Sequence, residues 1–188
     1  MSETRERLAV AAAELIDEGG RSAVTLREVG KRAGVSHNTP YKHFDSKEDL
    51  LGCVAAVELR QLSRAIEQSA CGQSGLDRVE AAVQVYLTWA RAHPARFALT
   101  FGAWTDPHQE LGQAAIQCRE AMLHTVNTAV GEEAQLSISG EEILSLAWSL
   151  AHGAADLDRA GHLRKTEGSP SAETLVGTLM RLVRGGGA

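Results

Sequence analysis

A run of polar side chains near the N-terminus can form hydrogen bonds with the edges of nucleic-acid bases. Residues 37–42 read HNTPYK, and few apolar residues accompany them. Asn38 could pair with adenine through two hydrogen bonds, Thr39 could contact a thymine methyl group, and His37 could donate to guanine. Because such a segment has little apolar surface of its own, neighbouring elements must hold it in place.

The segments on either side of this run carry helix-end signals. Thr25 and Glu28 have the T-x-x-E spacing of a capping box. Gly34 can adopt the left-handed conformation that ends a helix and permits a tight turn. Ser46 and Asp49 form a second box of the same kind, which opens a longer helix. The pattern predicts a helix-turn-helix, a motif that sets its second helix into the DNA major groove.

The rest of the chain shows helical periodicity, and no segment alternates with the period of two expected for a strand. Gly19-Gly20, His93-Pro94 and the segment CGQSG are typical helix breaks. The expected helices lie at about 3–18, 25–33, 36–43, 46 to the high sixties, 76–92, a short segment around Phe97, 106–130 (opened by Asp106-Pro107), 140–162 (capped by Ser139) and 172–184.

Charge is distributed unevenly along the chain. The formal net charge of −5 at pH 7 alone would argue against a nucleic-acid partner. Residues 21–47, however, carry six basic and two acidic side chains, a balance of +4, whereas residues 51–188 carry 11 basic and 15 acidic ones, a balance of −4. We therefore expect one end of the chain to approach phosphates while the remainder repels them.

Composition also limits the class of protein. With 188 residues, of which 44% are hydrophobic, the chain can bury a core and form one or two domains. Cys53, Cys71 and Cys118 are odd in number and too widely spaced for a disulfide framework or a zinc site. No run is long enough to cross a bilayer, and the charged N-terminus lacks a signal-peptide pattern. We expect a cytoplasmic protein with no cofactor, no metal and no membrane partner.

Residues 25–51 resemble the DNA-binding domain of the TetR/AcrR family of bacterial transcriptional regulators. The segment TLREVGKRAGVSHNTPYKHFDSKEDLL contains, in order, the capping box, the A-G-V-S turn, the Y-x-H-F motif and S-K-x-x-L. Further along, Trp148-x-x-x-His152-Gly153 is similar to the WHG-type C-terminal domain of that family, a looser match than the first.

The expected fold is all-α with about nine helices. It comprises an N-terminal three-helix helix-turn-helix domain at 1–50 and a C-terminal helical domain at 51–188 that is WHG-like over about 75–184. The resemblance implies a homodimer on a near-palindromic operator in double-stranded DNA. It also implies repression that is relieved when a small-molecule effector binds the C-terminal domain.

Two kinds of DNA contact are expected within the helix-turn-helix. Thr25 lies at a helix N-terminus, where free amides can bind a phosphate. Lys47 begins a helix, a position that the dipole disfavours for a cation unless an anion such as phosphate is its partner. Base reading is expected from residues 37–39. The full set of expected DNA contacts is Thr25, Arg27, Ser36, His37, Asn38, Thr39, Tyr41, Lys42, His43 and Lys47.

Aromatic residues favour an effector pocket in the second half of the chain. They make up only 4% of the sequence, yet most lie between residues 86 and 148. We expect a largely apolar, aromatic effector with one polar group near His152. The expected pocket residues are Trp89, Phe97, Phe101, Trp104, Cys118, Met122, Trp148 and His152.

The last two expected helices are apolar on nearly all sides, which indicates burial on two faces. One face can pack on the subunit's own core and the other on a second subunit, forming a four-helix interface. The residues expected at that interface are Ile143, Ala147, Leu150, Ala154, Leu175, Leu179 and Leu182.

Two other interpretations remain open at this point. Ser149, His152 and Asp156 share a helix face, which invites a catalytic triad, but no nucleophile elbow or glycine-rich oxyanion turn accompanies them. Dinucleotide, P-loop and HExxH motifs are also absent from the sequence. We therefore expect no catalytic residues and no enzyme activity.

The second alternative is an architectural DNA-binding protein without a ligand. Such a protein would have a basic C-terminal part or arms that enter the minor groove. Here the C-terminal part is acidic, and the leader carries Arg5 and Arg7 against Glu3 and Glu6. The sequence thus favours the ligand-responsive regulator.

Overall fold

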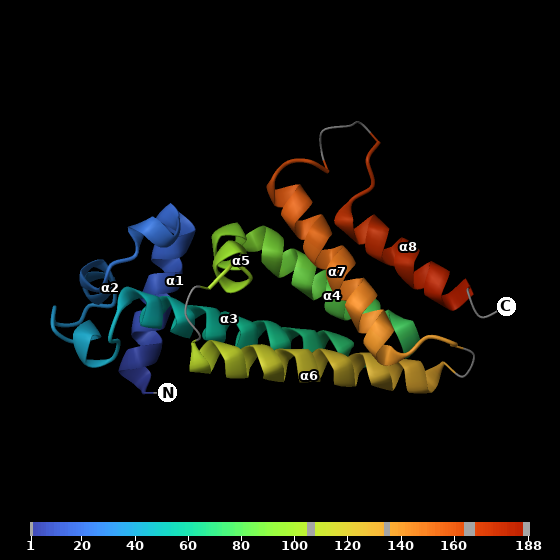
Figure 1. Ribbon diagram of the computed structural model, residues 1–188, viewed down its shortest axis with the longest axis horizontal. Helices are drawn as coiled ribbons and strands as arrows, with labels where there is room; N and C mark the ends of the chain where they lie inside the picture. Colours follow the sequence, from blue (N-terminus) through green and yellow to red (C-terminus); the bar gives the residue numbers. More distant parts are fainter. Residues whose placement is uncertain (1, 105–107, 134–135, 164–167, 186–188) are drawn as a thin grey trace. The chain divides into compact units, whose positions relative to one another are not determined.

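The computed structural model describes residues 2–104, 108–133, 136–163 and 168–185 (Figure 1). Within these ranges the fold is all-α, as predicted, with eight α-helices, one 3₁₀ helix and no strand. In chain order the elements are α1 (Glu3–Ala23), α2 (Leu26–Arg32), η1 (Pro40–Lys42), α3 (Lys47–Ala70), α4 (Gly75–Ala92), α5 (Pro94–Thr100), α6 (Gln109–Glu132), α7 (Gly140–Arg159) and α8 (Ala172–Gly185).

The helices form two compact units, and each unit consists of two separate stretches of chain. The first comprises Met1–Gln61 and His93–Gln117, and the second comprises Leu62–Ala92 and Cys118–Ala188. This division differs from the expected boundary at residue 50, because α3 continues as one helix until Ala70. The chain then returns to the first unit through α5 and the first part of α6.

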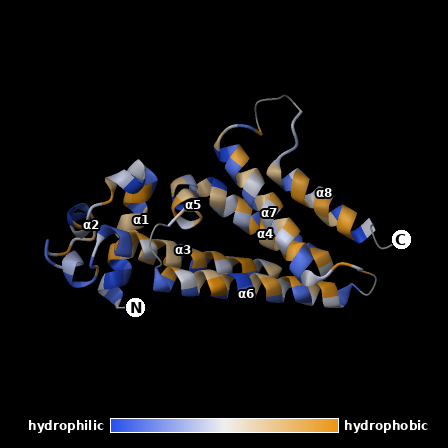
Figure 2. Ribbon diagram, viewed as in Figure 1, coloured by the Kyte–Doolittle hydropathy of each residue, from blue (hydrophilic) through white to orange (hydrophobic). Residues whose placement is uncertain are grey.

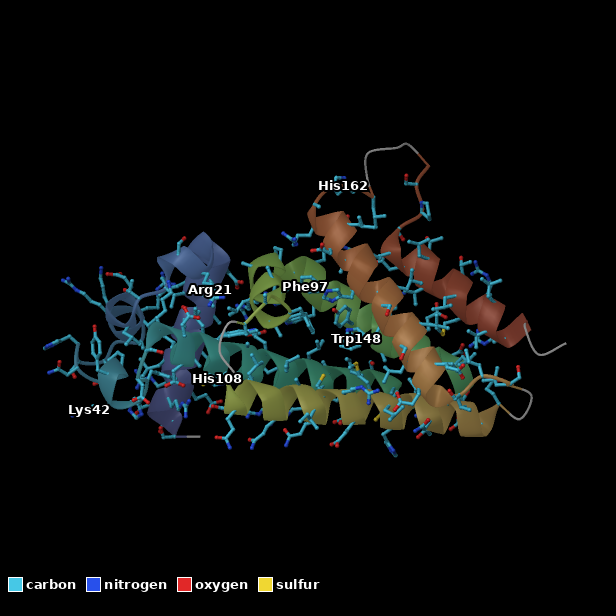
Figure 3. The ribbon with its side chains drawn as sticks, viewed as in Figure 1. Arg21, Lys42, Phe97, His108, Trp148 and His162 are labelled. Atoms are coloured by element: carbon cyan, nitrogen blue, oxygen red, sulfur yellow. The ribbon has the colours of Figure 1, made fainter. Side chains whose placement is uncertain are left out.

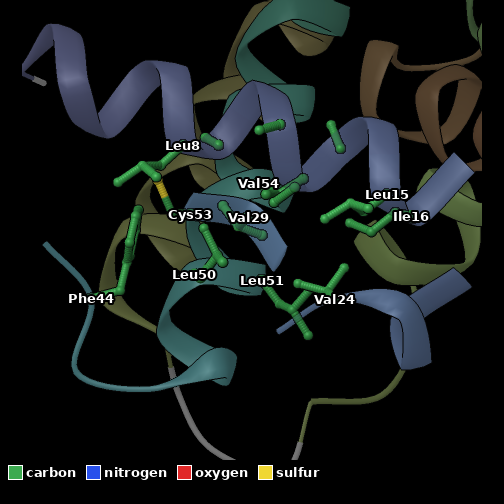
Figure 4. Close-up of a cluster of buried hydrophobic side chains, with 14 of the residues drawn as sticks. Leu8, Leu15, Ile16, Val24, Val29, Phe44, Leu50, Leu51, Cys53 and Val54 are labelled. Carbon is green, nitrogen blue, oxygen red and sulfur yellow. The ribbon is translucent and has the colours of Figure 1, made fainter. Parts of the chain in front are cut away.

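The first unit has a core of apolar side chains from α1, α2, the start of α3 and α5 (Figure 4). α1 packs against both α2 and α5. Burying a side chain of this size contributes about 1.5–3 kcal/mol relative to leaving it in water, so these contacts fix the short helices to the longer ones. The larger members of the core are Leu8, Leu15, Ile16, Val24, Val29, Phe44, Leu50, Leu51, Val54 and Leu99.

In the second unit α4, α7 and α8 pack against one another. α7 begins with a complete capping box: the Glu142 N–H donates to Ser139 Oγ at 3.3 Å, and the Ser139 N–H donates to the Glu142 carboxylate at 2.9 Å. The Gly75 N–H at the start of α4 donates to Glu132 Oε2 at 2.6 Å. α7 ends at Arg159, earlier than the expected residue 162.

Two further expectations concern segment ends and membranes. The predicted helix start at Asp106-Pro107 lies outside the described residues, and α6 is described from Gln109. As predicted, the helical backbone of α1 is interrupted at Gly19 and Gly20, where Gly20 has φ of 67°; a short second helical stretch then extends to Ala23. Among the helices described, none combines the length and apolarity that crossing a bilayer requires.

The polar run after Gly34 forms successive tight turns, and the predicted helix at 36–43 is therefore wrong in type. The N–H of Thr39 donates to Ser36 O at 2.9 Å, that of Lys42 to Thr39 O at 3.1 Å and that of His43 to Pro40 O at 3.0 Å. All three bonds span three residues, the pattern of a 3₁₀ helix. Pro40 has no N–H to donate to Ser36 O, so a regular α-helix cannot form across it.

Pro40 anchors these turns to α2. Its ring is buried and packs on Gly30, where an added Cβ would lie 2.9 Å from Pro40 Cγ. After Pro40, the Phe44 N–H donates to Pro40 O at 2.9 Å, and the Phe44 ring enters the core of the first unit. Pro40 thus anchors the middle of this otherwise polar segment, and Phe44 anchors the chain directly after it.

We predict that Gly30→Ala destabilises the protein by about 1–3 kcal/mol, because the new methyl group overlaps a proline ring that cannot rotate away. The matched control is Gly112→Ala in α6, where an added Cβ meets nothing within 4 Å. The control should stabilise by up to about 1 kcal/mol through helix propensity. Denaturant unfolding of both variants measures the difference; equal stability of the two would contradict the packing role of Gly30.

Candidate nucleic-acid interface and apolar cavity

Most of the expected DNA contacts lie on one exposed polar segment of the first unit, which Figure 2 colours mostly as hydrophilic. Tyr41 is 59% exposed, and Lys42 extends outward from η1 (Figure 3). The exposed members are Thr25, Arg27, Ser36, His37, Asn38, Tyr41 and Lys42, while Thr39, His43 and Lys47 are half-buried.

Hydrogen bonds within the segment separate structural side chains from free ones. Thr25 Oγ1 accepts the Glu28 N–H at 3.1 Å, which makes Thr25 the N-cap of α2. Ser36 Oγ and Thr39 Oγ1 lie 2.7 Å apart and bond to each other. The side chains of His37 and Asn38 form no hydrogen bond within the described part of the chain, so their polar atoms are available to a ligand.

Ion pairs reduce the number of cations available to phosphates. Arg21 pairs with Glu48, and Arg32 pairs with Glu18 at 2.6 Å and with Glu14 at 3.3 Å. The hydrogen bond from Arg32 lowers the pKa of Glu18, which stays charged. The basic residues of segment 21–47 that form no ion pair with any described residue are Arg27, Lys31, Lys42 and Lys47.

Arg5 and Arg7, which lie near the start of α1, both form contacts within the first unit. Arg7 donates to Ala33 O at 2.7 Å, at the C-terminal end of α2. Arg5 pairs with Glu110 at 3.2 Å, and its guanidinium lies 4.9 Å from the centre of the Phe44 ring. These contacts give Arg5 and Arg7 of α1 a structural role in the first unit.

A small cavity with an apolar wall lies within the second unit. Its volume is about 40 Å³. Tyr86 of α4, Met122 of α6 and Trp148 of α7 contribute the longest side chains. The full lining is Ile66, Val79, Ala82, Val83, Tyr86, Met122, Thr125, Val126, Leu144, Ala147, Trp148 and Ala151.

Of the expected pocket residues in this unit, Met122 and Trp148 line the cavity directly. His152 is one layer behind the wall, where its Nδ1 lies 2.8 Å from the Tyr86 hydroxyl. Cys118 is buried but is not part of the lining, and Trp89 is half-buried on α4 outside it. Tyr86 itself was missed by the sequence analysis, although its position on the buried face of its helix could have indicated it.

The remaining three expected pocket residues belong to the first unit. Pro94 starts α5 after the break at His93, and α5 packs on α1. Phe97 is buried there, with its ring centre 5.3 Å from that of Phe101. The Arg21 guanidinium lies 5.3 Å from the ring of Trp104. Phe97, Phe101 and Trp104 are thus absent from the cavity lining.

Most of the α7 residues that were expected at the dimer interface lie on the buried face of the helix. Ile143, Ala147 and Ala154 are buried by their own chain, so they offer no surface to a partner. The exposed or half-buried apolar positions of α7 are Leu146, Trp148, Leu150, Gly153, Ala155 and Leu157, and those of α8 are Leu175, Gly177, Leu179, Leu182 and Val183. Leu150, Leu175, Leu179 and Leu182 therefore keep the accessibility that the sequence analysis expected.

The residues of the alternative triad form other contacts. His152 bonds to Tyr86, and Asp156 pairs with Arg159 at 2.7 Å. Ser149 is exposed on α7. The His152 imidazole thus contacts Tyr86, which has no part in a serine-hydrolase triad.

Two family models match the chain and cover most of it. Residues 8–53 match the model described as "Bacterial regulatory proteins, tetR family", and residues 79–182 match "Tetracyclin repressor-like, C-terminal domain". Together with the all-α fold and the exposed polar segment, they define a helix-turn-helix DNA-binding transcriptional regulator. The chain belongs to the TetR family.

Individual proteins and solved structures are similar to this chain. The HTH-type transcriptional activator FasR of Mycolicibacterium smegmatis is 27% identical over 137 residues, which are 70% of this chain and 63% of that protein. A protein of unknown function from Rhodococcus sp. RHA1 has a TM-score of 0.82 at 24% identity, covering 99% of this chain and 96% of that one. The regulator FadR from Bacillus subtilis, in complex with stearoyl-CoA, has a TM-score of 0.69 at 16% identity, with coverage of 96% and 98%.

We predict that only Cys71 reacts rapidly with a thiol reagent at pH 8. Burial raises the pKa of Cys53 and of Cys118 to about 11, so few of these thiols are ionised at pH 8, whereas Cys71 is exposed. Because the thiolate is the reactive form, Ellman's reagent should detect one thiol in the native protein and three after denaturation. A fast reaction that persists in Cys71→Ser would contradict this assignment.

Proposed function

We propose that the chain is a homodimeric repressor that binds a near-palindromic operator and leaves it when a small apolar molecule enters the cavity. It would act in the cytoplasm, where bacterial DNA lies. One observation carries the proposal: a segment of exposed base-reading side chains is flanked by cations that have no ion pair in the described structure.

The chemistry of the segment supports a division of roles on DNA. His37 and Asn38 have free polar atoms for base edges, and Thr39 is expected to contribute its methyl group. Lys42, Lys47 and the hydroxyl of Tyr41 would bind phosphates around them. Each reading segment reaches only three or four bases, so one subunit cannot define a unique site.

The exposed apolar face of α7 and α8 supports a dimer. Leu182 is 67% exposed and Leu146 47% exposed, and both lie on helices that pack on each other. A face with this much apolar surface is typical of an interface with a second copy of the chain. Two copies would present two reading segments, which favours half-sites about 34–36 Å apart.

One helix supplies a route for coupling between ligand and DNA. α3 begins at Lys47, an expected phosphate contact, and includes Ile66, which lines the cavity. A ligand that shifts this helix would change the placement of the residues that precede it. A coupling free energy of about 1–3 kcal/mol, typical of allosteric proteins, would lower operator affinity about 5- to 150-fold.

The relatives give limited further support. FadR from Bacillus subtilis was solved with stearoyl-CoA, so the shared fold can hold a ligand with a long apolar chain. FasR is named an activator, so the direction of regulation by this chain needs its own test. A reporter gene placed behind an operator that the protein binds would provide that test.

We predict that Lys42→Ala weakens binding to all DNA sequences alike. Each lost phosphate contact should make the slope of log K against log salt shallower by about 0.9, hence by about two for both subunits. The control is Arg32→Ala, which removes the same charge from a side chain already paired with Glu14 and Glu18. Equal salt slopes for the two variants would refute the proposed phosphate contact.

Asn38→Ala should instead alter base preference. A side chain that reads a base discriminates against the wrong one by about 1–3 kcal/mol, and discrimination at one position of each half-site should fall by that amount. Titration against an operator library measures this change. If Asn38→Ala and Lys42→Ala weaken all sequences equally, the division of roles is incorrect.

We predict that Leu182→Glu converts the dimer to monomers, because it places a charge in an apolar interface. The control is Ile116→Glu on α6, which is 61% exposed and lies outside the proposed interface. Analytical ultracentrifugation should show monomers for the first variant and dimers for the second. Dimers in both would place the interface elsewhere.

A further inference from the structure

His108 stands directly before α6 and caps that helix with its side chain. Its main-chain oxygen accepts the Gly112 N–H at 2.9 Å, and its Nδ1 accepts the Leu111 N–H at 3.2 Å. These two bonds place His108 at the N-cap, a position that Asn, Asp, Ser and Thr usually occupy. The ring thus satisfies one of the amide groups that the start of a helix leaves without a partner.

The other nitrogen of the same ring contacts α3 within the first unit (Figure 3). Nε2 lies 3.2 Å from the main-chain oxygen of Asp49 and 3.2 Å from Asp49 Oδ1, and the His108 side chain is only 16% exposed. Arg5 is also near this carboxylate oxygen, but at 3.9 Å it is beyond hydrogen-bonding distance. His108 therefore links the start of α6 to the first turn of α3.

The partners of the ring determine its tautomer. A main-chain N–H can only donate, so Nδ1 accepts from Leu111 and carries no proton. The main-chain oxygen of Asp49 can only accept, so Nε2 carries the proton and donates to Asp49. One ring thus serves two separate roles, a cap on α6 and a link to α3.

Gly52 provides the space for this ring. It lies one turn after Asp49 on α3, and an added Cβ there would overlap the His108 ring, with Nε2 at 2.6 Å. Glycine is unfavourable inside a helix, and here it leaves room that any larger side chain would fill.

Asp49 extends the link to the turns at residues 36–43. Its Oδ2 accepts the Asp45 N–H at 3.1 Å, and its own N–H donates to Ser46 Oγ at 3.0 Å. Asp45 directly follows Phe44, where the chain leaves the turns. His108 on Oδ1 and the Asp45 N–H on Oδ2 together fix the orientation of the Asp49 carboxylate.

We infer that His108 is a positioning residue for DNA binding, which acts through Asp49 and does not itself touch DNA. The inference rests on the proposed function, in which residues within 25–47 bind the operator. Without the bond from His108, the Asp49 carboxylate can turn toward solvent, and the chain at Asp45 loses its anchor. The turns must then be ordered when DNA binds, at a cost in affinity.

Two substitutions separate the link from the cap. His108→Asn keeps a good N-cap acceptor for the Leu111 N–H, but its shorter side chain cannot reach Asp49. His108→Gln has an amide N–H and the length to reach Asp49, but glutamine is not a favoured N-cap residue. A purely structural role would make the glutamine variant the more damaging one, whereas a positioning role predicts the reverse for DNA binding.

The test is titration of the full-length variants with an operator selected by the wild-type protein, alongside thermal unfolding. His108→Asn should lower operator affinity about tenfold, because both subunits must order their turns on binding, and should unfold like the wild type. His108→Gln should keep near-wild-type affinity and unfold at a lower temperature. Full affinity in His108→Asn, or affinities that follow thermal stability, would overturn the inference.

The salt dependence distinguishes positioning from a direct phosphate contact by His108. The slope of log K against log salt should be the same in His108→Asn and the wild type, because no phosphate contact is lost. A shallower slope in the variant would identify His108 as a DNA contact and would overturn the inference.

Gly52→Ala is an independent check, because its methyl group would displace the ring. It should lower operator affinity in the wild-type background and have no further effect in His108→Ala, where no ring is present. An equal loss of affinity in both backgrounds would contradict the inference.

Hydrogen exchange at the Asp45 amide, followed by NMR, tests the link without DNA. Exchange should be faster in His108→Asn than in the wild type and in His108→Gln. Faster exchange in a protein that binds no DNA specifically would refute the proposed function and retain the link. Specific DNA binding by the wild type with equal exchange in all three proteins would refute the inference alone.

Discussion

The contact between Pro40 and Gly30 is the constraint on which the proposed DNA-reading surface depends. The segment from Ser36 to His43 is polar and cannot stabilise itself by burying its own side chains. Pro40 on α2 anchors the middle of this segment and Phe44 in the core anchors the chain directly after it, while the turn from Ser36 to Thr39 keeps His37 and Asn38 on the surface. The side chains of His37 and Asn38 are thus positioned by these apolar anchors and by the hydrogen bonds of the turns.

The two units differ in the side chains that they leave available to a ligand. In the first unit, ion pairs such as Arg32 with Glu18 leave a few cations near the reading turns without a partner. In the second unit no charged side chain lines the cavity, and the hydroxyls of Tyr86 and Thr125 bond to His152 and to Ala121 O, which are outside its lining. A polyanion and an apolar molecule can therefore be bound by one chain without competing for the same groups.

Local signals in the sequence predicted most of the fold, whereas long-range packing was beyond them. The caps at Thr25 and Ser139 place helix starts correctly because they act over three residues. The turns at 36–43 were misjudged because Pro40 removes one donor from an otherwise helical pattern. The dimer-interface residues expected on α7 were assigned to the wrong face of the helix. Apolar residues surround α7, so the periodicity of the sequence does not show which face packs on the core of its own subunit. Phe97 was assigned to the pocket because nothing local reveals that α5 packs on α1.

Selection of bound DNA from a random pool by the purified full-length protein tests the central claim most directly, since it examines sequence reading and dimer symmetry together. The account predicts recovery of a near-palindromic site whose half-site centres lie one helical turn, about 10–10.5 base pairs, or a multiple of it apart. Recovery of no common sequence at near-physiological salt, or of a single unrepeated half-site, would contradict it.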